Sequence, residues 1–232
     1  MMPTFVAPSL RRMIGAALLL AAALMLFPTV AGAHADPIRM DPGIGGVVFL
    51  PAENGAITGS ITVRTWLSER AERNFTFFEV HDPAGERVDV AGSLTLESQG
   101  AIVTVGVAPK RIGEHRISYR ILSAVDGHTN QGNLTFFVAE ATPGMGSALA
   151  ALPGELVVRT PAALGAQSIS ITLLKDGSSV LSGQGAFSRN GDADVARIEL
   201  PQSAPGTYEV RWELSTNSGP KFGVYSFTVG GS

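Results

Sequence analysis

The side chains that could do chemistry are few, and they point to metal binding. The sequence has 232 residues, with four histidines and no cysteine. The absence of cysteine excludes disulfides, Cys-ligated zinc, iron–sulfur clusters and a thiol nucleophile. No nucleotide-binding loop, hydrolase elbow or zinc-protease motif occurs, so we expect no nucleotide cofactor. A net charge of −3 without a basic run gives no footprint for nucleic acid.

The segment Ser123-Ala-Val-Asp126-Gly127-His128 carries the clearest chemical signal. Side chains at i and i+2 of an extended segment point to the same side, so the Asp126 carboxylate and the His128 imidazole converge. A carboxylate oxygen beside an imidazole nitrogen is half of a tetragonal site suited to Cu(II). Most Asp-Gly-His triplets are simple turns, and that alternative stays open.

The start of the chain predicts export. Arg11 and Arg12 precede an apolar run, residues 14–27, which is shorter than the roughly 20 residues of a membrane span. A small-residue cleavage motif, Ala31-Gly32-Ala33, follows. We therefore predict a signal peptide over residues 1–33, with an uncleaved anchor as the alternative.

Cleavage after Ala33 would make His34 the mature N-terminus, whereas a second register would start the protein at Asp36. An N-terminal histidine offers one metal both its α-amine and its imidazole. The α-amine deprotonates near pH ~8, so a metal displaces its proton at modest cost. His34 with Asp126 and His128 then makes a complete Cu(II) donor set.

The elements that must position these residues are predicted to be β-strands. Residues 61–67 largely alternate between apolar and polar side chains, and Asn-Gly and Asp-Gly turn signals separate such runs. No mature segment has a sustained helical period. Twenty-seven glycines and fourteen prolines also argue against a helical bundle. The predicted fold class is all-β, built of sandwiches.

The two halves of the mature chain read as a repeat. Residues 113–121 match residues 206–214, and each segment precedes a closing strand, at 133–138 and 224–229. We predict two tandem Ig-like β-sandwich domains, at 34–140 and 155–232, joined by an Ala/Gly/Pro-rich linker at 141–154. The second domain carries no histidine and cannot repeat the metal site.

The remaining candidates have simpler interpretations. His115 falls on the apolar face of its strand, which favours a buried, hydrogen-bonded histidine. His81 precedes a turn, which favours a solvated surface position. The aromatic group of Trp66, Phe75, Phe77 and Phe78 is expected to belong to the sandwich core, with Phe77 and Phe78 on opposite faces of a strand.

In this order the motifs of the first domain resemble the CopC family of periplasmic copper-resistance proteins. The matching pieces are His34, the Pro51-to-Gly55 turn, Trp66-Leu-Ser-Glu69, His115-to-Tyr119, Asp126-Gly-His128 and Phe136-Phe-Val138. The second domain resembles the same family through residues 206–212 and 225–229. The stretch before Pro51 is some eight residues longer than the family pattern, and Val125 is an extra residue in the Asp-Gly-His loop.

The resemblance implies a Greek-key β-sandwich that binds one Cu(II) per chain in the periplasm and buffers or delivers it. By position, His34, Asp126 and His128 are ligands, and Glu69 is a weak fourth ligand or a partner of the ligands. Met40 and Met145 are too few and too scattered for a Cu(I) thioether site.

Copper buffering or chaperoning without enzymatic activity is therefore the leading hypothesis. The rival is a metal-free tandem sandwich that acts as a structural or interaction module of the cell envelope. A copper enzyme with an N-terminal histidine chelate is a third. Two roles of the second domain stay open. It could dock to an inner-membrane copper permease, or it could cover the first domain.

Overall fold

The computed structural model describes residues 34–201 and 204–230. They belong to one compact unit that begins at His34. The predicted signal peptide, residues 1–33, lies outside the described residues. In the described part of the chain the regular elements are β-strands and short 3-10 turns, without an α-helix, so the all-β prediction is confirmed.

A four-stranded antiparallel sheet in the order β1-β5-β8-β7 forms one layer around the first core. Its strand β5 follows the predicted alternation, because Ile61, Val63, Thr65 and Leu67 are buried and the residues between them are not. Trp66 lies on the outer side, where the Arg39 guanidinium covers its ring at 4.4 Å. The strands are β1 (Pro37–Asp41), β5 (Ile61–Leu67), β7 (Thr95–Glu97) and β8 (Ile102–Val107).

A larger sheet contributes to both cores, in the order β15-β16-β12-β10-β9-β6, with β2 paired in parallel to β10. Its central strand β10 pairs with β9 through residues 129–138 and with β12 through residues 140–142. The strands are β2 (Val47–Leu50), β6 (Phe77–His81), β9 (Gly113–Leu122), β10 (Thr129–Thr142), β12 (Glu155–Pro161), β15 (Ser188–Asn190) and β16 (Ala193–Glu199).

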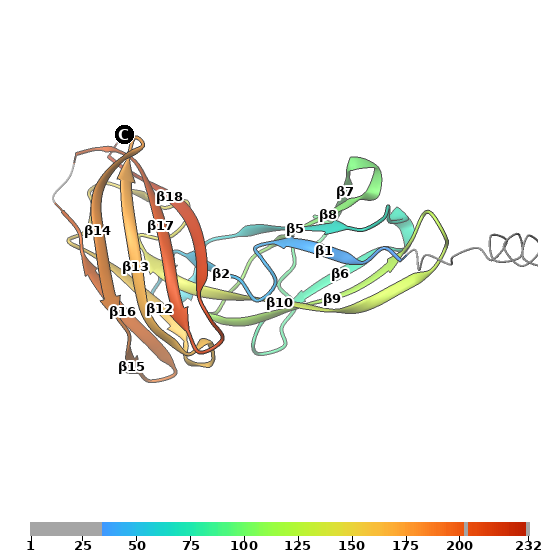
Figure 1. Cartoon of the computed structure of the whole chain (residues 1–232), viewed down its shortest axis with the longest axis horizontal. Helices are drawn as coiled ribbons and strands as arrows, with labels where there is room; N and C mark the ends of the chain where they lie inside the picture. The colour runs from blue at the N-terminus through green and yellow to red at the C-terminus, as the bar shows by residue number, and fades with distance from the viewer. Residues whose placement is uncertain (1–33, 202–203, 231–232) are drawn as a thin grey trace, which may run out of the picture. The chain divides into compact units, whose positions relative to one another are not determined.

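A five-stranded sheet in the order β11-β18-β17-β13-β14 covers the second core, and its long strands lie side by side in Figure 1. Strand β17 buries Tyr208, Val210, Trp212 and Leu214 on one face. The strands are β11 (Ala148–Leu149), β13 (Ala166–Lys175), β14 (Ser178–Ala186), β17 (Gly206–Thr216) and β18 (Lys221–Val229). The small elements are β3 (Ala52–Glu53), β4 (Ala56–Ile57), η1 (Arg73–Phe75), η2 (Ser98–Gly100) and η3 (Ala162–Leu164).

The two cores share strand β10. Phe136 and Val138 are buried in the first core, and Ala139 and Ala141 in the second. Neighbouring residues of a strand point to opposite faces, so one strand can supply both cores. Strand β2 adds Phe49 to the second core, although it lies in the chain between strands β1 and β5 of the first. The division of the chain into two domains and a linker, with boundaries at residues 140 and 154, stays a prediction.

Of the aromatic group only Phe78 lies in the first core, so the core prediction is wrong for Trp66, Phe75 and Phe77. Phe78 is 3% exposed, and Trp66 is half-buried, but Phe75 and Phe77 are 56% and 54% exposed. Phe77 alternates with Phe78 on strand β6 and therefore faces outward, as the opposite-face prediction required. Phe75 lies in the η1 turn, where no sheet covers it.

Candidate metal centre

The Asp-Gly-His segment forms the tight loop between strands β9 and β10. Ser123 closes this loop: its backbone N–H donates to the His128 carbonyl at 2.9 Å, and its carbonyl accepts from the Gly127 N–H at 3.1 Å. Gly127 has φ of 74°, a conformation that glycine adopts without steric cost. This explains the glycine between the two candidate ligands.

Asp126 and His128 are brought together, as the spacing predicted. One carboxylate oxygen of Asp126 accepts from the His128 backbone N–H at 2.9 Å, and the other lies 2.7 Å from the His128 Nδ1. The backbone hydrogen bond from His128, with a further hydrogen bond from its ring, lowers the pKa of Asp126 to about 2. The carboxylate is therefore ionised at neutral pH, and its bond to Nδ1 leaves Nε2 of the exposed His128 ring free.

The segment that starts at His34 lies beside this loop. The rings of His34 and His128 stack with centroids 5.4 Å apart and an interplanar angle of 4°. Ala35 is fully buried in the first core, and the Asp36 N–H donates to the Ser68 hydroxyl at 2.9 Å. Burial of Ala35 and bonding of Asp36 thus fix the position of the His34 backbone.

Glu69 lies near the loop but contacts neither histidine by a hydrogen bond. Its Oε2 accepts from the Ser123 hydroxyl at 2.9 Å. The Ser123 hydroxyl in turn accepts from the Val125 and Asp126 N–H groups at 3.1 and 3.3 Å. Glu69 therefore reaches the candidate ligands through Ser123.

No cluster of three or more His, Cys, Asp or Glu side chains arranged to hold a metal occurs in residues 34–201 and 204–230. Instead, the His34 ring stacks on the His128 ring, and Asp126 is hydrogen-bonded to His128. Their chemistry nevertheless fits Cu(II), because two imidazoles and a carboxylate are the nitrogen and oxygen donors that this ion prefers.

The other two histidines are placed elsewhere. His115 is fully buried, stacks on Phe136 and hydrogen-bonds to the Gly113 carbonyl at 3.2 Å, so its core interpretation is confirmed. Burial lowers the pKa of His115. His81 ends strand β6 only partly exposed, and its Nδ1 is buried without a partner, so the solvated position predicted for it is wrong. His81 is the last residue of β6 and pairs with Arg116 of β9.

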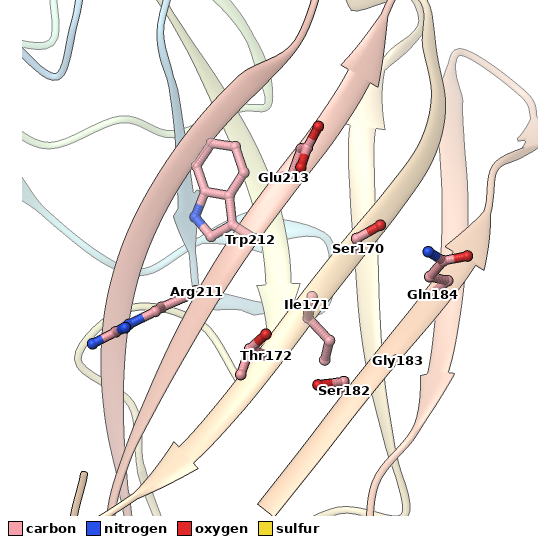
Figure 2. A pocket seen from close by; sticks show the side chains of 9 residues that line it. All are labelled: Ser170, Ile171, Thr172, Ser182, Gly183, Gln184, Arg211, Trp212 and Glu213. Carbon is pink, nitrogen blue, oxygen red and sulfur yellow. The ribbon is translucent and has the colours of Figure 1, made fainter. Parts of the chain in front are cut away.

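A hollow of about 490 Å³ lies on the five-stranded sheet of the second core. Figure 2 shows its lining from three strands: Ser170, Ile171 and Thr172 of β13, Ser182, Gly183 and Gln184 of β14, and Arg211, Trp212 and Glu213 of β17. This lining has no histidine, and its one carboxylate, Glu213, is exposed. This hollow therefore lacks the imidazole and carboxylate pair that the Asp126–His128 loop offers to a metal.

Sequence reasoning missed two residues of the candidate centre, Ser68 and Ser123. Ser68 directly precedes Glu69, and Ser123 begins the segment that contains the Asp-Gly-His triplet. A serine at the start of a loop commonly accepts from backbone N–H groups two or three residues on, and this pattern was the available signal for Ser123. Ser68 gave no local signal because its partners are distant in sequence.

Comparison with protein-family models decides the family. The model of the CopC domain matches this chain twice, over residues 50–139 and 138–230. The chain belongs to the CopC family. Both sandwiches are thus CopC domains, and the second match covers the half that lacks histidine.

Similar solved structures include two of CopC type. CopC from Methylosinus trichosporium OB3b has 17% identity and a TM-score of 0.37, covering 46% of this chain and 95% of its own. PcoC, a methionine-rich copper resistance protein from Escherichia coli, has 19% identity and a TM-score of 0.35, covering 46% and 99%. A chimeric titin tandem has 10% identity and a TM-score of 0.26, covering 84% and 97%. No curated protein matches this chain.

In the described part of this CopC protein, no helix combines the length and the hydropathy that crossing a membrane requires.

Proposed function

We propose that this CopC protein binds one Cu(II) in the periplasm and buffers or delivers it, without acting as an enzyme. Its ligands are His34, with α-amine and imidazole, His128 and Asp126. The observation that carries the proposal is the stacking of the His34 and His128 rings. Two sequence-distant histidines, one of them paired with an ionised carboxylate, meet at one end of the first core.

The position of His34 supports cleavage after Ala33. Ala35 is fully buried, and the Asp36 backbone is bonded to Ser68. A mature chain that started at Asp36 would lose the buried Ala35 side chain as well as His34. Cleavage after Ala33 keeps both and frees the α-amine as a further nitrogen donor.

The Asp126–His128 pair supports binding of one ion by both side chains. The carboxylate oxygen of Asp126 and Nδ1 of His128 lie 2.7 Å apart, so an ion that replaced the shared proton would contact both donors. The side chain of His128 is 66% exposed and that of His34 is exposed too, so both rings can turn toward one ion. The bound Cu(II) would have nitrogen and oxygen ligands. Its binding requires no redox partner, because the ion does not change oxidation state.

Two features favour a single Cu(II) and argue against Cu(I). The loop of the second domain that corresponds to Asp126-Gly-His128, residues 215–219, has hydroxyl and amide side chains and no histidine. Met40 is 4% exposed inside the first core, and Met145 packs against both cores. Neither thioether is presented for the soft coordination that Cu(I) prefers.

Native mass spectrometry of the exported protein tests this proposal. We expect a mature N-terminus at His34 and one Cu(II) per chain, lost in His128→Ala and retained in the matched control His81→Ala. A wild-type protein that retains no copper would overturn the proposal and favour the metal-free tandem sandwich. Oxygen-dependent turnover by the copper-loaded protein would instead favour the enzyme hypothesis.

A further inference from the structure

The dipeptide Ser68-Glu69 contacts both halves of the proposed copper centre. It follows strand β5, which ends at Leu67. Ser68 bonds to the segment that carries His34, and Glu69 bonds to the loop that carries Asp126 and His128. These two halves are separated by some ninety residues of sequence, and a single short segment connects them.

Ser68 holds the His34 half through its hydroxyl and its backbone. The hydroxyl donates to the His34 carbonyl and accepts from the Asp36 N–H at 2.9 Å. The Ser68 backbone N–H donates to the Asp36 carbonyl at 2.8 Å. Replacing Ser68 with alanine removes the two hydroxyl bonds and leaves the backbone bond.

Glu69 holds the loop through Ser123, which is 2% exposed. A serine hydroxyl has one donor and two acceptor positions. Here the donor goes to Glu69 at 2.9 Å, and the acceptor positions take the Val125 and Asp126 N–H groups at 3.1 and 3.3 Å. Glu69 therefore directs the hydroxyl proton away from the loop, so that the lone pairs face the two N–H groups.

The backbone reinforces this connection. The Ala124 N–H donates to the Arg70 carbonyl, and the Glu72 N–H donates to the Leu122 carbonyl, both at 2.8 Å. Ala71 and Ser123 form an antiparallel bridge. The segment after Glu69 is thus paired along the start of the Asp-Gly-His loop, which keeps the Glu69 carboxylate opposite Ser123.

We propose that Ser68 and Glu69 are positioning residues that hold the two halves of the Cu(II) centre together, with Glu69 acting through Ser123 and not as a ligand. This inference rests on the proposed function, that copper binds at His34, Asp126 and His128. Removal of such a supporting hydrogen bond commonly weakens metal affinity about 10- to 100-fold.

The experiment compares Glu69→Ala with Glu69→Gln, because the glutamine oxygen still accepts from Ser123 but an amide is a poor Cu(II) ligand. Ser68→Ala tests the other half, and the exposed Glu114→Ala and Ser179→Ala are matched controls. Amide hydrogen exchange of the copper-free proteins and Cu(II) affinity by competition titration are measured on each. Electron paramagnetic resonance reports the ligand set.

We expect Glu69→Ala to speed amide exchange at Val125 and Asp126 and to weaken Cu(II) binding at least about tenfold. Glu69→Gln and both controls should stay within about twofold of wild type, with the resonance spectrum unchanged. Ser68→Ala should speed exchange at Asp36 and weaken Cu(II) binding in the same range.

Equal losses in Glu69→Gln and Glu69→Ala with an altered spectrum would make Glu69 a ligand and overturn the proposal. Unchanged amide exchange in Glu69→Ala would overturn it as well. If wild type binds copper while the variants match it, the positioning role fails alone. If wild type binds none, the proposed function fails together with the role derived from it.

Discussion

At the scale of single residues, His115 shows how burial controls protonation. The ring is fully buried between Phe136 and the backbone at Gly113, and its Nε2 has no hydrogen-bond partner. Burial disfavours the charged imidazolium and lowers the pKa of His115 below the ordinary 6.5. The folded protein therefore keeps this ring neutral in a pH range where the unfolded chain takes up a proton.

Stability should consequently fall as the pH drops below about 6.5, by up to ~1.4 kcal/mol per pH unit from this residue. The sign follows from the lowered folded pKa, because the unfolded state binds more protons there. His115→Phe, which suits the apolar site, should reduce this pH dependence between pH 7 and pH 5.5. Urea unfolding at both pH values measures it, and an equal dependence in wild type and variant would contradict the assignment to His115.

At the scale of elements, strands β17 and β18 depend on a glycine. Trp212 faces Gly223 across the two strands, and a Cβ at Gly223 would lie 2.3 Å from the Trp212 ring. Trp212 also meets Phe49 of strand β2 edge-on, with centroids 4.8 Å apart. The indole can take this position in the second core only because position 223 has no side chain.

Gly223→Ala should therefore displace the Trp212 ring and destabilise the protein by about 1–3 kcal/mol. The change should be visible in Trp212 fluorescence in a Trp66→Phe background, since the chain has two tryptophans. The control is Ser179→Ala, because Ser179 is exposed on strand β14 and its φ is not positive. Gly177→Ala is less suitable because Gly177 has a positive φ, which strains any other residue. An unchanged spectrum and midpoint in Gly223→Ala would contradict this account.

The strands themselves were largely predictable from sequence. Alternation at residues 61–67 located β5, because this strand buries one face. The repeat of residues 113–121 in residues 206–214 located β9 and β17. The parallel pairing of β2 with β10 was not predictable, since it joins segments without a shared local pattern. The same holds for the candidate site: spacing predicted the Asp126–His128 pair, but the bonds of Ser68 and Ser123 depend on the folded arrangement.

At the scale of the whole molecule, the shared strand predicts cooperative unfolding. Strand β10 contributes Phe136 and Val138 to one core and Ala139 and Ala141 to the other. Loss of either core would expose apolar residues of the strand that supports its neighbour. Residues 34–232 accordingly form one compact unit.

Each core has one tryptophan near it, Trp66 beside the first and Trp212 in the second. Single-tryptophan variants Trp66→Phe and Trp212→Phe should therefore report the same urea midpoint, once corrected for the stability change of each substitution by circular dichroism. A midpoint that differs between fluorescence and circular dichroism in either variant would mean that the cores unfold independently.

The sharing of β10 also bears on how a duplicated gene of this kind can evolve. Strand β10 runs to Thr142 and pairs there with β12, so both copies are joined through a backbone ladder instead of a free tether. Recombination within residues 129–161 would leave Val47, Phe49 and Ala139 without their covering sheet. The histidine-free domain therefore closes an interior to which β2 and β10 contribute, and this structural role does not depend on metal ligands.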